Sequence, residues 1–111
     1  MSAIDYEIDD FFGKIASIRM DMQTYENWCK NYETFRYKYP QWITKTNEAI
    51  NIYDMDDNHI NNTINMLEER DKNNSWIAIL KQEKNYRELK NKIKELNIEL
   101  SAYQKVANLV F

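Results

Sequence analysis

Glycine, proline, cysteine and histidine each occur only once in this chain of 111 residues. One glycine and one proline are too few for a fold rich in tight turns, so we expect a few long elements. A single cysteine cannot form an intrachain disulfide, and one cysteine with one histidine cannot complete a structural zinc site. A glycine-rich phosphate-binding loop is excluded on the same count.

Long apolar runs are also missing, because no stretch of eighteen apolar residues is present to span a membrane. The N-terminus is acidic and lacks the basic and apolar regions of a signal peptide. Together with the lone cysteine, these features predict a cytoplasmic protein without a membrane partner. With 43% hydrophobic residues, 30% charged residues and a net charge of −3, the composition is that of a globular protein. Its length predicts one domain, residues 1–111.

The clearest pattern lies between Trp76 and Val110, where apolar residues recur three and four positions apart, as they do along one face of an α-helix. In heptad numbering, the inward-facing sites are Ile79, Gln82, Tyr86, Leu89, Ile93, Leu96, Leu100, Tyr103, Ala107 and Val110. Gln82 is the exception in this stripe, because its side chain ends in a polar amide. We expect a helix over residues 75–110, with Ser75 as its N-cap.

A second long stripe starts near the N-terminus and predicts a helix over residues 3–38. Ser2 is suited to the N-cap, and Pro40 disfavours helix at the residue before it. Gly13 lies inside this helix and costs about 1 kcal/mol relative to alanine. Close approach of a neighbouring helix would explain a residue without a side chain at that position.

The middle of the chain predicts a helix over residues 41–71, again with three-four spacing. Its stripe is Ile43, Thr46, Ile50, Tyr53, Asp57, Ile60, Ile64 and Leu67. A kink or break near residues 54–58 is the alternative, because three acids lie close together there and aspartate and asparagine are poor helix-interior residues. In that case Asp57 would cap the second half.

Three segments of similar length with short links predict an all-α fold, an up-down-up antiparallel three-helix bundle with helices over about 3–38, 41–71 and 75–110. A long coiled-coil dimer is the competing arrangement. Tyr86, Tyr103 and Gln82 at core sites are poor choices for a tight two-stranded seam. The bundle is therefore favoured.

Catalytic and metal sites find little support in the sequence. Asp54, Asp56 and Asn58 match the first ligands of a calcium-binding loop, but His59 and Asn65 replace its essential glycine and glutamate. Cys29 falls on the core stripe, where a cysteine is normally inert. We expect no enzymatic activity, no cofactor, no metal and no small-molecule substrate.

A basic face on the last helix raises the question of nucleic-acid binding. The candidate residues are Lys81, Lys84, Arg87, Lys94 and Lys105. Glu88 and Glu95 interrupt this face, and no aromatic residue interleaves the bases as in proteins that bind single strands. Solvation of the helix is the favoured interpretation, and a nucleic-acid partner is disfavoured.

Aromatic residues are concentrated between Tyr25 and Trp42, and aromatic rings are typical anchors of protein interfaces. The predicted partner-binding residues are Phe35, Tyr37, Trp42, Ile98 and Phe111. We expect a non-enzymatic protein–protein interaction or assembly module that binds a protein partner or itself. The alternative is a small phage- or virus-encoded inhibitor of a host nucleic-acid-processing or defence protein, which would use the acidic part of the chain.

Overall fold

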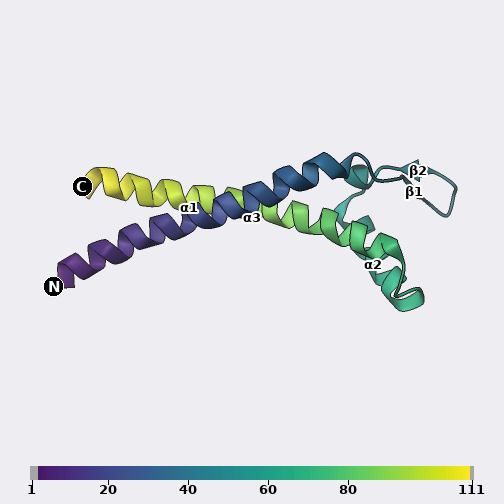
Figure 1. Cartoon of the computed structure of the whole chain (residues 1–111), viewed down its shortest axis with the longest axis horizontal. Coiled ribbons are helices and arrows are strands. Elements are labelled where there is room, and N and C mark those ends of the chain that lie inside the picture. Colours follow the sequence, from purple (N-terminus) through teal and green to yellow (C-terminus); the bar gives the residue numbers. More distant parts are fainter. Residues whose placement is uncertain (1–2, 111) are drawn as a thin grey trace. The chain divides into compact units, whose positions relative to one another are not determined.

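The structure, a computed structural model, describes residues 3–110 and the side chains of residues 8–109. Its elements are α1 (Ala3–Arg36), β1 (Trp42–Ile43), β2 (Ala49–Ile50), the 3-10 helix η1 (Ile52–Asp54), α2 (Asp57–Arg70) and α3 (Ser75–Val110) (Figure 1). The predicted all-α class with three helices is confirmed. Ser2, the expected N-cap of the first helix, and Phe111, an expected partner contact, lie outside the described residues.

Residue contacts divide the chain into two compact units. The terminal unit combines the chain up to Trp28 with the chain from Lys90 onward, and the central unit runs from Cys29 to Leu89. Each unit has a hydrophobic core of its own. The expectation of a single domain stays a prediction.

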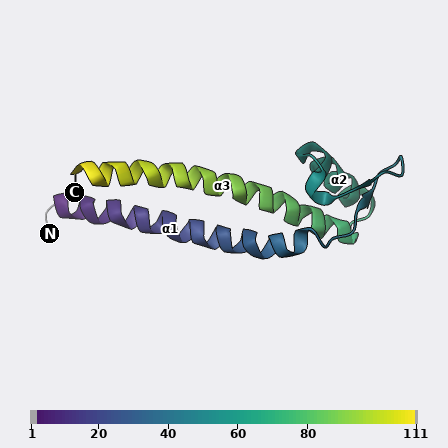
Figure 2. The same ribbon diagram turned by 90° about the horizontal axis from the view of Figure 1, so that it is seen from above.

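In the terminal unit, the start of α1 runs alongside the end of α3 (Figure 2). The buried residues come from the predicted stripes of both helices: Ile15, Ile18, Leu96 and Leu100. Tyr103 packs against Phe11 with the rings tilted and 5.3 Å between their centroids. A Cβ added to Gly13 would meet nothing within 4 Å. The expected close approach of a helix at this glycine is therefore wrong.

The helix predicted from residue 41 is wrong over its first half, where the chain forms a β-hairpin (Figure 1). Strands β1 and β2 pair antiparallel, with Trp42 opposite Ile50. In the connecting turn, Asn47 N–H donates to Thr44 O at 3.0 Å, and Asn47 itself has a left-handed φ of 63°. Asparagine tolerates this conformation, and β-branched residues such as Ile43 favour strands over helices. The three-four spacing of the apolar residues here was coincidental.

The break at residues 54–58, which was the alternative to a continuous helix, is confirmed, because α2 begins at Asp57 after η1. The cap is Asp56 rather than Asp57: its Oδ1 accepts the backbone N–H of His59 at 2.7 Å. At the start of α3 the cap is likewise one residue earlier than expected. There Asn74 Oδ1 accepts the backbone N–H of Trp76 at 2.9 Å, in place of Ser75.

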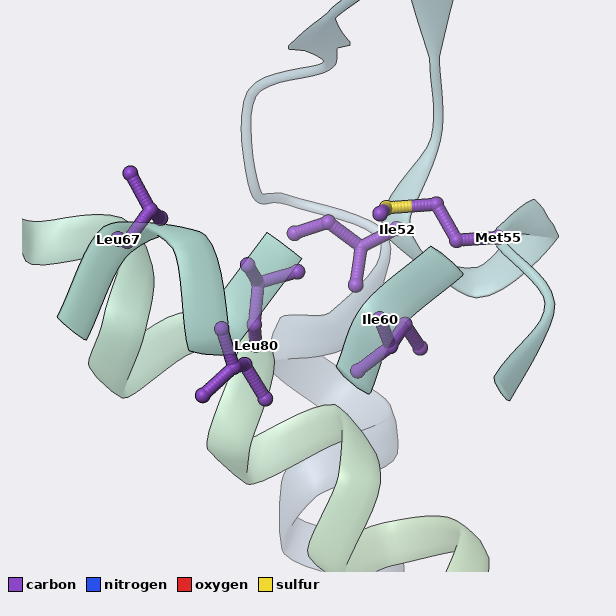
Figure 3. Packing of buried hydrophobic residues seen from close by; sticks show 6 residues of the cluster. Ile52, Met55, Ile60, Leu67 and Leu80 are labelled. Atoms are coloured by element: carbon purple, nitrogen blue, oxygen red, sulfur yellow. The ribbon is translucent and has the colours of Figure 1, made fainter. Parts of the chain in front are cut away.

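The core of the central unit lies between η1, α2 and the start of α3 (Figure 3). Its buried members are Ile52, Met55, Ile60, Ile64, Leu67 and Leu80. Around it, Trp42 of the hairpin packs edge-on against Trp76 of α3, with 5.3 Å between ring centroids. Gln82, the polar member of the α3 stripe, accepts a hydrogen bond from the Tyr39 hydroxyl at 2.5 Å, which satisfies its side-chain oxygen.

Candidate interaction surface

The central unit holds one fully buried carboxylate, that of Glu83 on α3, with an exposed fraction of 0%. Its Oε1 accepts hydrogen bonds from the Tyr32 hydroxyl at 2.9 Å and from Arg36 Nε at 2.8 Å. Its Oε2 accepts from Arg36 Nη2 and from Arg87 Nε, both at 2.8 Å. We call these four residues the Glu83 network. Since each oxygen accepts two hydrogen bonds, the carboxylate joins the end of α1 to α3 within this unit.

Three members of the network, Glu83, Arg36 and Arg87, are charged, and Tyr32 is neutral. Burial alone would raise the pKa of Glu83, but hydrogen bonds from Arg36, Arg87 and Tyr32 outweigh it and hold the pKa below its ordinary value. Burial would likewise lower the pKa of both arginines, yet their carboxylate partners keep it above the usual range. Burial and the hydrogen bond to Glu83 raise the pKa of Tyr32, so its hydroxyl remains a donor. One carboxylate therefore faces two permanent positive charges.

Arg87 extends the network to the segment before α2. Its Nη1 donates to Asp57 Oδ1 at 2.8 Å, and its Nη2 donates to the carbonyl oxygen of Ile52 at 3.3 Å. One guanidinium thus connects α3 with η1 and with the first turn of α2. The sequence pattern had placed Arg87 on a solvated basic face. In the structure, its side chain instead forms hydrogen bonds within the protein.

Arg36 extends the network toward the surface through its aromatic neighbours. Its guanidinium carbon lies 4.6 Å from the ring centroid of Tyr86, and 5.7 Å from those of Tyr37 and Tyr53. A guanidinium at this range over a ring face is attracted by the negative charge of the π-system. Tyr37 also contacts Tyr53 edge-to-face, with centroids 4.8 Å apart. The position of the Tyr37 ring is therefore fixed on two sides.

Two rings at the end of α1 face solvent: Phe35 is 56% exposed and Tyr37 is 63% exposed. We call them the exposed aromatic pair. Lys38 Nζ lies 5.9 Å from the Phe35 ring centroid, close enough for a cation–π contact. The two rings expose apolar surface to water, which is unfavourable. The backbone that carries them is held in place by the neighbouring Glu83 network.

The other predicted contact residues are not gathered at this place. Trp42 lies on β1 and is half-buried against Trp76. Ile98 is 72% exposed but belongs to the terminal unit. Helical register placed Tyr37 outside the core and left Phe35 at a marginal position that flanks the stripe; both side chains are exposed. The role of all these residues in binding stays a prediction.

The remaining basic candidates on α3 differ in their surroundings. Lys81 forms an exposed ion pair with Glu68 of α2 at 3.1 Å. Lys84, Lys94 and Lys105 are exposed, the first in the central unit and the other two in the terminal unit. Nucleic-acid binding by this face stays a prediction, and the contacts of these lysines add no support to it.

The acidic side chains just before α2 form hydrogen bonds that stabilise the local structure. Asp56 caps α2, and Asp54 accepts a hydrogen bond from the Asn51 side chain at 3.3 Å. Among the residues that the structure describes, no three His, Cys, Asp or Glu side chains gather so as to hold a metal ion. Cys29 is buried in α1, as its place in the apolar stripe predicted.

Sequence reasoning missed Glu83 as an organising residue. Glu83 and Arg87 are four residues apart, a spacing that allows an ion pair along a helix, and that pair is present at 2.8 Å. Sequence reasoning had not linked Glu83 to Arg36, which is 47 residues away in the chain. The signal available in the sequence was that Arg36 continues the apolar stripe of α1, where an arginine needs a buried counter-charge.

Comparisons with protein-family models, with curated proteins and with solved structures found no match. Within residues 3–110, none of the helices combines the length and the apolar character needed to cross a membrane. Inferences about function therefore depend on the geometry of the central unit.

Proposed function

We propose that this chain is a non-enzymatic protein–protein interaction module and that the exposed aromatic pair contacts its partner. The observation that carries the proposal is the exposure of Phe35 and Tyr37 next to a buried ionic network that fixes the end of α1. Aromatic residues are enriched at protein interfaces. Because both rings lie at the same helix end, one partner that covers this end would contact both.

The rigidity of the site supports a role in binding. Ordering a flexible side chain at an interface costs about 0.5–1.5 kcal/mol, which reduces affinity. Tyr37 is already held between Arg36 and Tyr53, so less of this cost remains to be met when a partner binds. A buried aromatic anchor typically contributes about 2 kcal/mol or more, or about thirtyfold in affinity. The partner is a protein or a second copy of the chain, met in the cytoplasm.

The test compares two double variants. Phe35→Ala/Tyr37→Ala removes the aromatic pair, and Met20→Ala/Leu109→Ala removes two apolar residues of the terminal unit that are even more exposed. Affinity for the protein captured from the native cell, or for self-association measured by sedimentation equilibrium, should fall about thirtyfold only in the first variant. Circular dichroism should show both variants folded. Equal binding by the two variants would count against the proposal.

A second candidate function is that of an inhibitor, encoded by a phage or virus, of a host nucleic-acid-processing or defence protein. It is favoured by the exposed acidic residues around α2, which are Asp54, Asp56, Asp57, Glu68, Glu69 and Asp71. Such a surface would fit a basic groove. Binding led by acids should weaken steeply as salt rises, whereas binding led by the aromatic pair should change little. A salt titration of the same complex separates the two.

A further inference from the structure

Each strand of the β-hairpin has an outer edge whose backbone groups are not used within the hairpin. Thr44 N–H donates to Glu48 O at 2.9 Å, so residues 44 and 48 form a hydrogen-bonded pair. Such pairs alternate along an antiparallel ladder, which makes Ile43 and Ala49 a non-hydrogen-bonded pair. The N–H and C=O of Ile43 therefore point away from β2. They are suited to pairing with a further strand.

A groove of about 490 Å³ adjoins this edge. One wall is β1 and the turn after it, and the other is a single face of α2, where residues recur at i, i+4 and i+7. The lining residues are Trp42, Ile43, Thr44, Lys45, His59, Thr63 and Met66. No residue of β2 lines it, so the groove lies on the free side of β1. Its size is within the range of small binding pockets.

The lining defines what the groove can take. It is mainly apolar, and Ile43 is 56% exposed within it. Its ionisable members are Lys45 and His59, one a cation and the other able to donate a ring N–H, and no carboxylate is among them. The groove therefore suits an apolar side chain with a carboxylate close to it.

We propose that the groove binds an extended peptide segment of a partner protein, which pairs with the outer edge of β1 as a third strand. Backbone hydrogen bonds to Ile43 supply affinity, and an apolar side chain in the groove with an acidic residue near Lys45 supplies specificity. Symmetric pairing with β1 of a second copy fits less well, because residues 41–45 read Gln-Trp-Ile-Thr-Lys and contain no acid. This site is separate from the exposed aromatic pair.

The probe is a phage-displayed library of random peptides, panned on the full-length protein. Enriched peptides should carry an apolar residue and an Asp or Glu two positions apart, the spacing that places both side chains on one face of a strand. One enriched peptide is then synthesised with a fluorophore, and its affinity is measured by fluorescence polarisation. Absence of such a consensus would overturn the proposal.

Matched proline variants test the strand edge itself. Ile43→Pro removes the outward N–H of β1, whereas Ala49→Pro removes the outward N–H of β2, and neither N–H takes part in the ladder between the strands. Ile43→Pro should lower the affinity for the peptide by at least about tenfold, and Ala49→Pro should leave it unchanged. Circular dichroism and tryptophan fluorescence verify that both variants keep the fold. Equal affinities would refute pairing at β1.

Two further arms exclude the neighbouring explanations. Lys45→Glu should lower the affinity for an acidic peptide. Changing the acid of that peptide to lysine should restore its affinity for the Lys45→Glu variant. Phe35→Ala/Tyr37→Ala should leave peptide affinity unchanged, so failure of this site and failure of the proposed function are distinguishable. Self-association that is lost in Ile43→Pro, without any enriched peptide, would make a second copy the occupant and the peptide proposal wrong.

Discussion

Replacing Glu83 by glutamine should destabilise the protein far more than the same replacement elsewhere. The amide keeps one accepting oxygen, but its NH2 group cannot accept the hydrogen bonds that Arg36 Nη2 and Arg87 Nε give to the second oxygen. Both guanidinium groups also lose the negative charge between them. Breaking a buried ion pair by removing one partner costs about 3–5 kcal/mol.

The structure places the expected cost of Glu83→Gln near the lower end of that range. Arg87 keeps Asp57 as a partner at 2.8 Å, and the Arg36 side chain retains 14% exposure to solvent. A loss of about 3 kcal/mol should lower the melting temperature of a domain of this size by about 12 °C. The matched control is Glu68→Gln, which removes an exposed ion pair with Lys81 and should cost at most about 1 kcal/mol.

Urea unfolding followed by far-UV circular dichroism measures both variants on one scale. The pH dependence supplies a second readout. Because the folded-state pKa of Glu83 lies below its ordinary value of 4.5, its contribution to stability is complete above pH 4.5 and is lost as the pH falls further. The stability gap between wild type and Glu83→Gln should narrow below pH 4.5. If Glu83→Gln were as stable as Glu68→Gln at neutral pH, the Glu83 network would not stabilise the fold.

Two further predictions concern α1 and Tyr86. Gly13→Ala should raise stability by about 0.5–1 kcal/mol in thermal melts, because the added Cβ meets no atom and the helix gains propensity; a loss would mean that this face of α1 is covered. Burial and the hydrogen bond to Glu33 raise the pKa of Tyr86 to about 12, so its contribution to stability is present below pH 10 and is lost as the pH rises from 10 through 12. Tyr86→Phe should remove one late-ionising phenol from an ultraviolet titration, and an unchanged titration would contradict this assignment.

The two long helices could be predicted from sequence because their apolar stripes persist over many turns and their ends carry local signals. Pro40 limited α1 to within two residues of its observed end at Arg36. The hairpin could not be predicted in the same way. Ile43, Thr46 and Ile50 satisfy a helical spacing, yet their branched side chains also suit strands, and the turn at Asn47 decides between the two.

The candidate surface shows the same division. Register placed Tyr37 off the core stripe, which agrees with its exposure, but it left Phe35 at a marginal position. The burial of Glu83 depends on Arg36 and Tyr32, which are distant in the chain, and a charged residue on a helix is normally solvated. Local periodicity carries no information about such a partner.

The most direct test of the interaction role is site-specific photo-crosslinking in the native cell. A photoreactive phenylalanine analogue replaces Phe35 in one variant and Met20, an exposed residue of the terminal unit, in the other. We expect one discrete crosslinked product, with a protein partner or a second copy, from position 35 and none from position 20. Crosslinks at neither position, or the same products from both, would contradict this expectation.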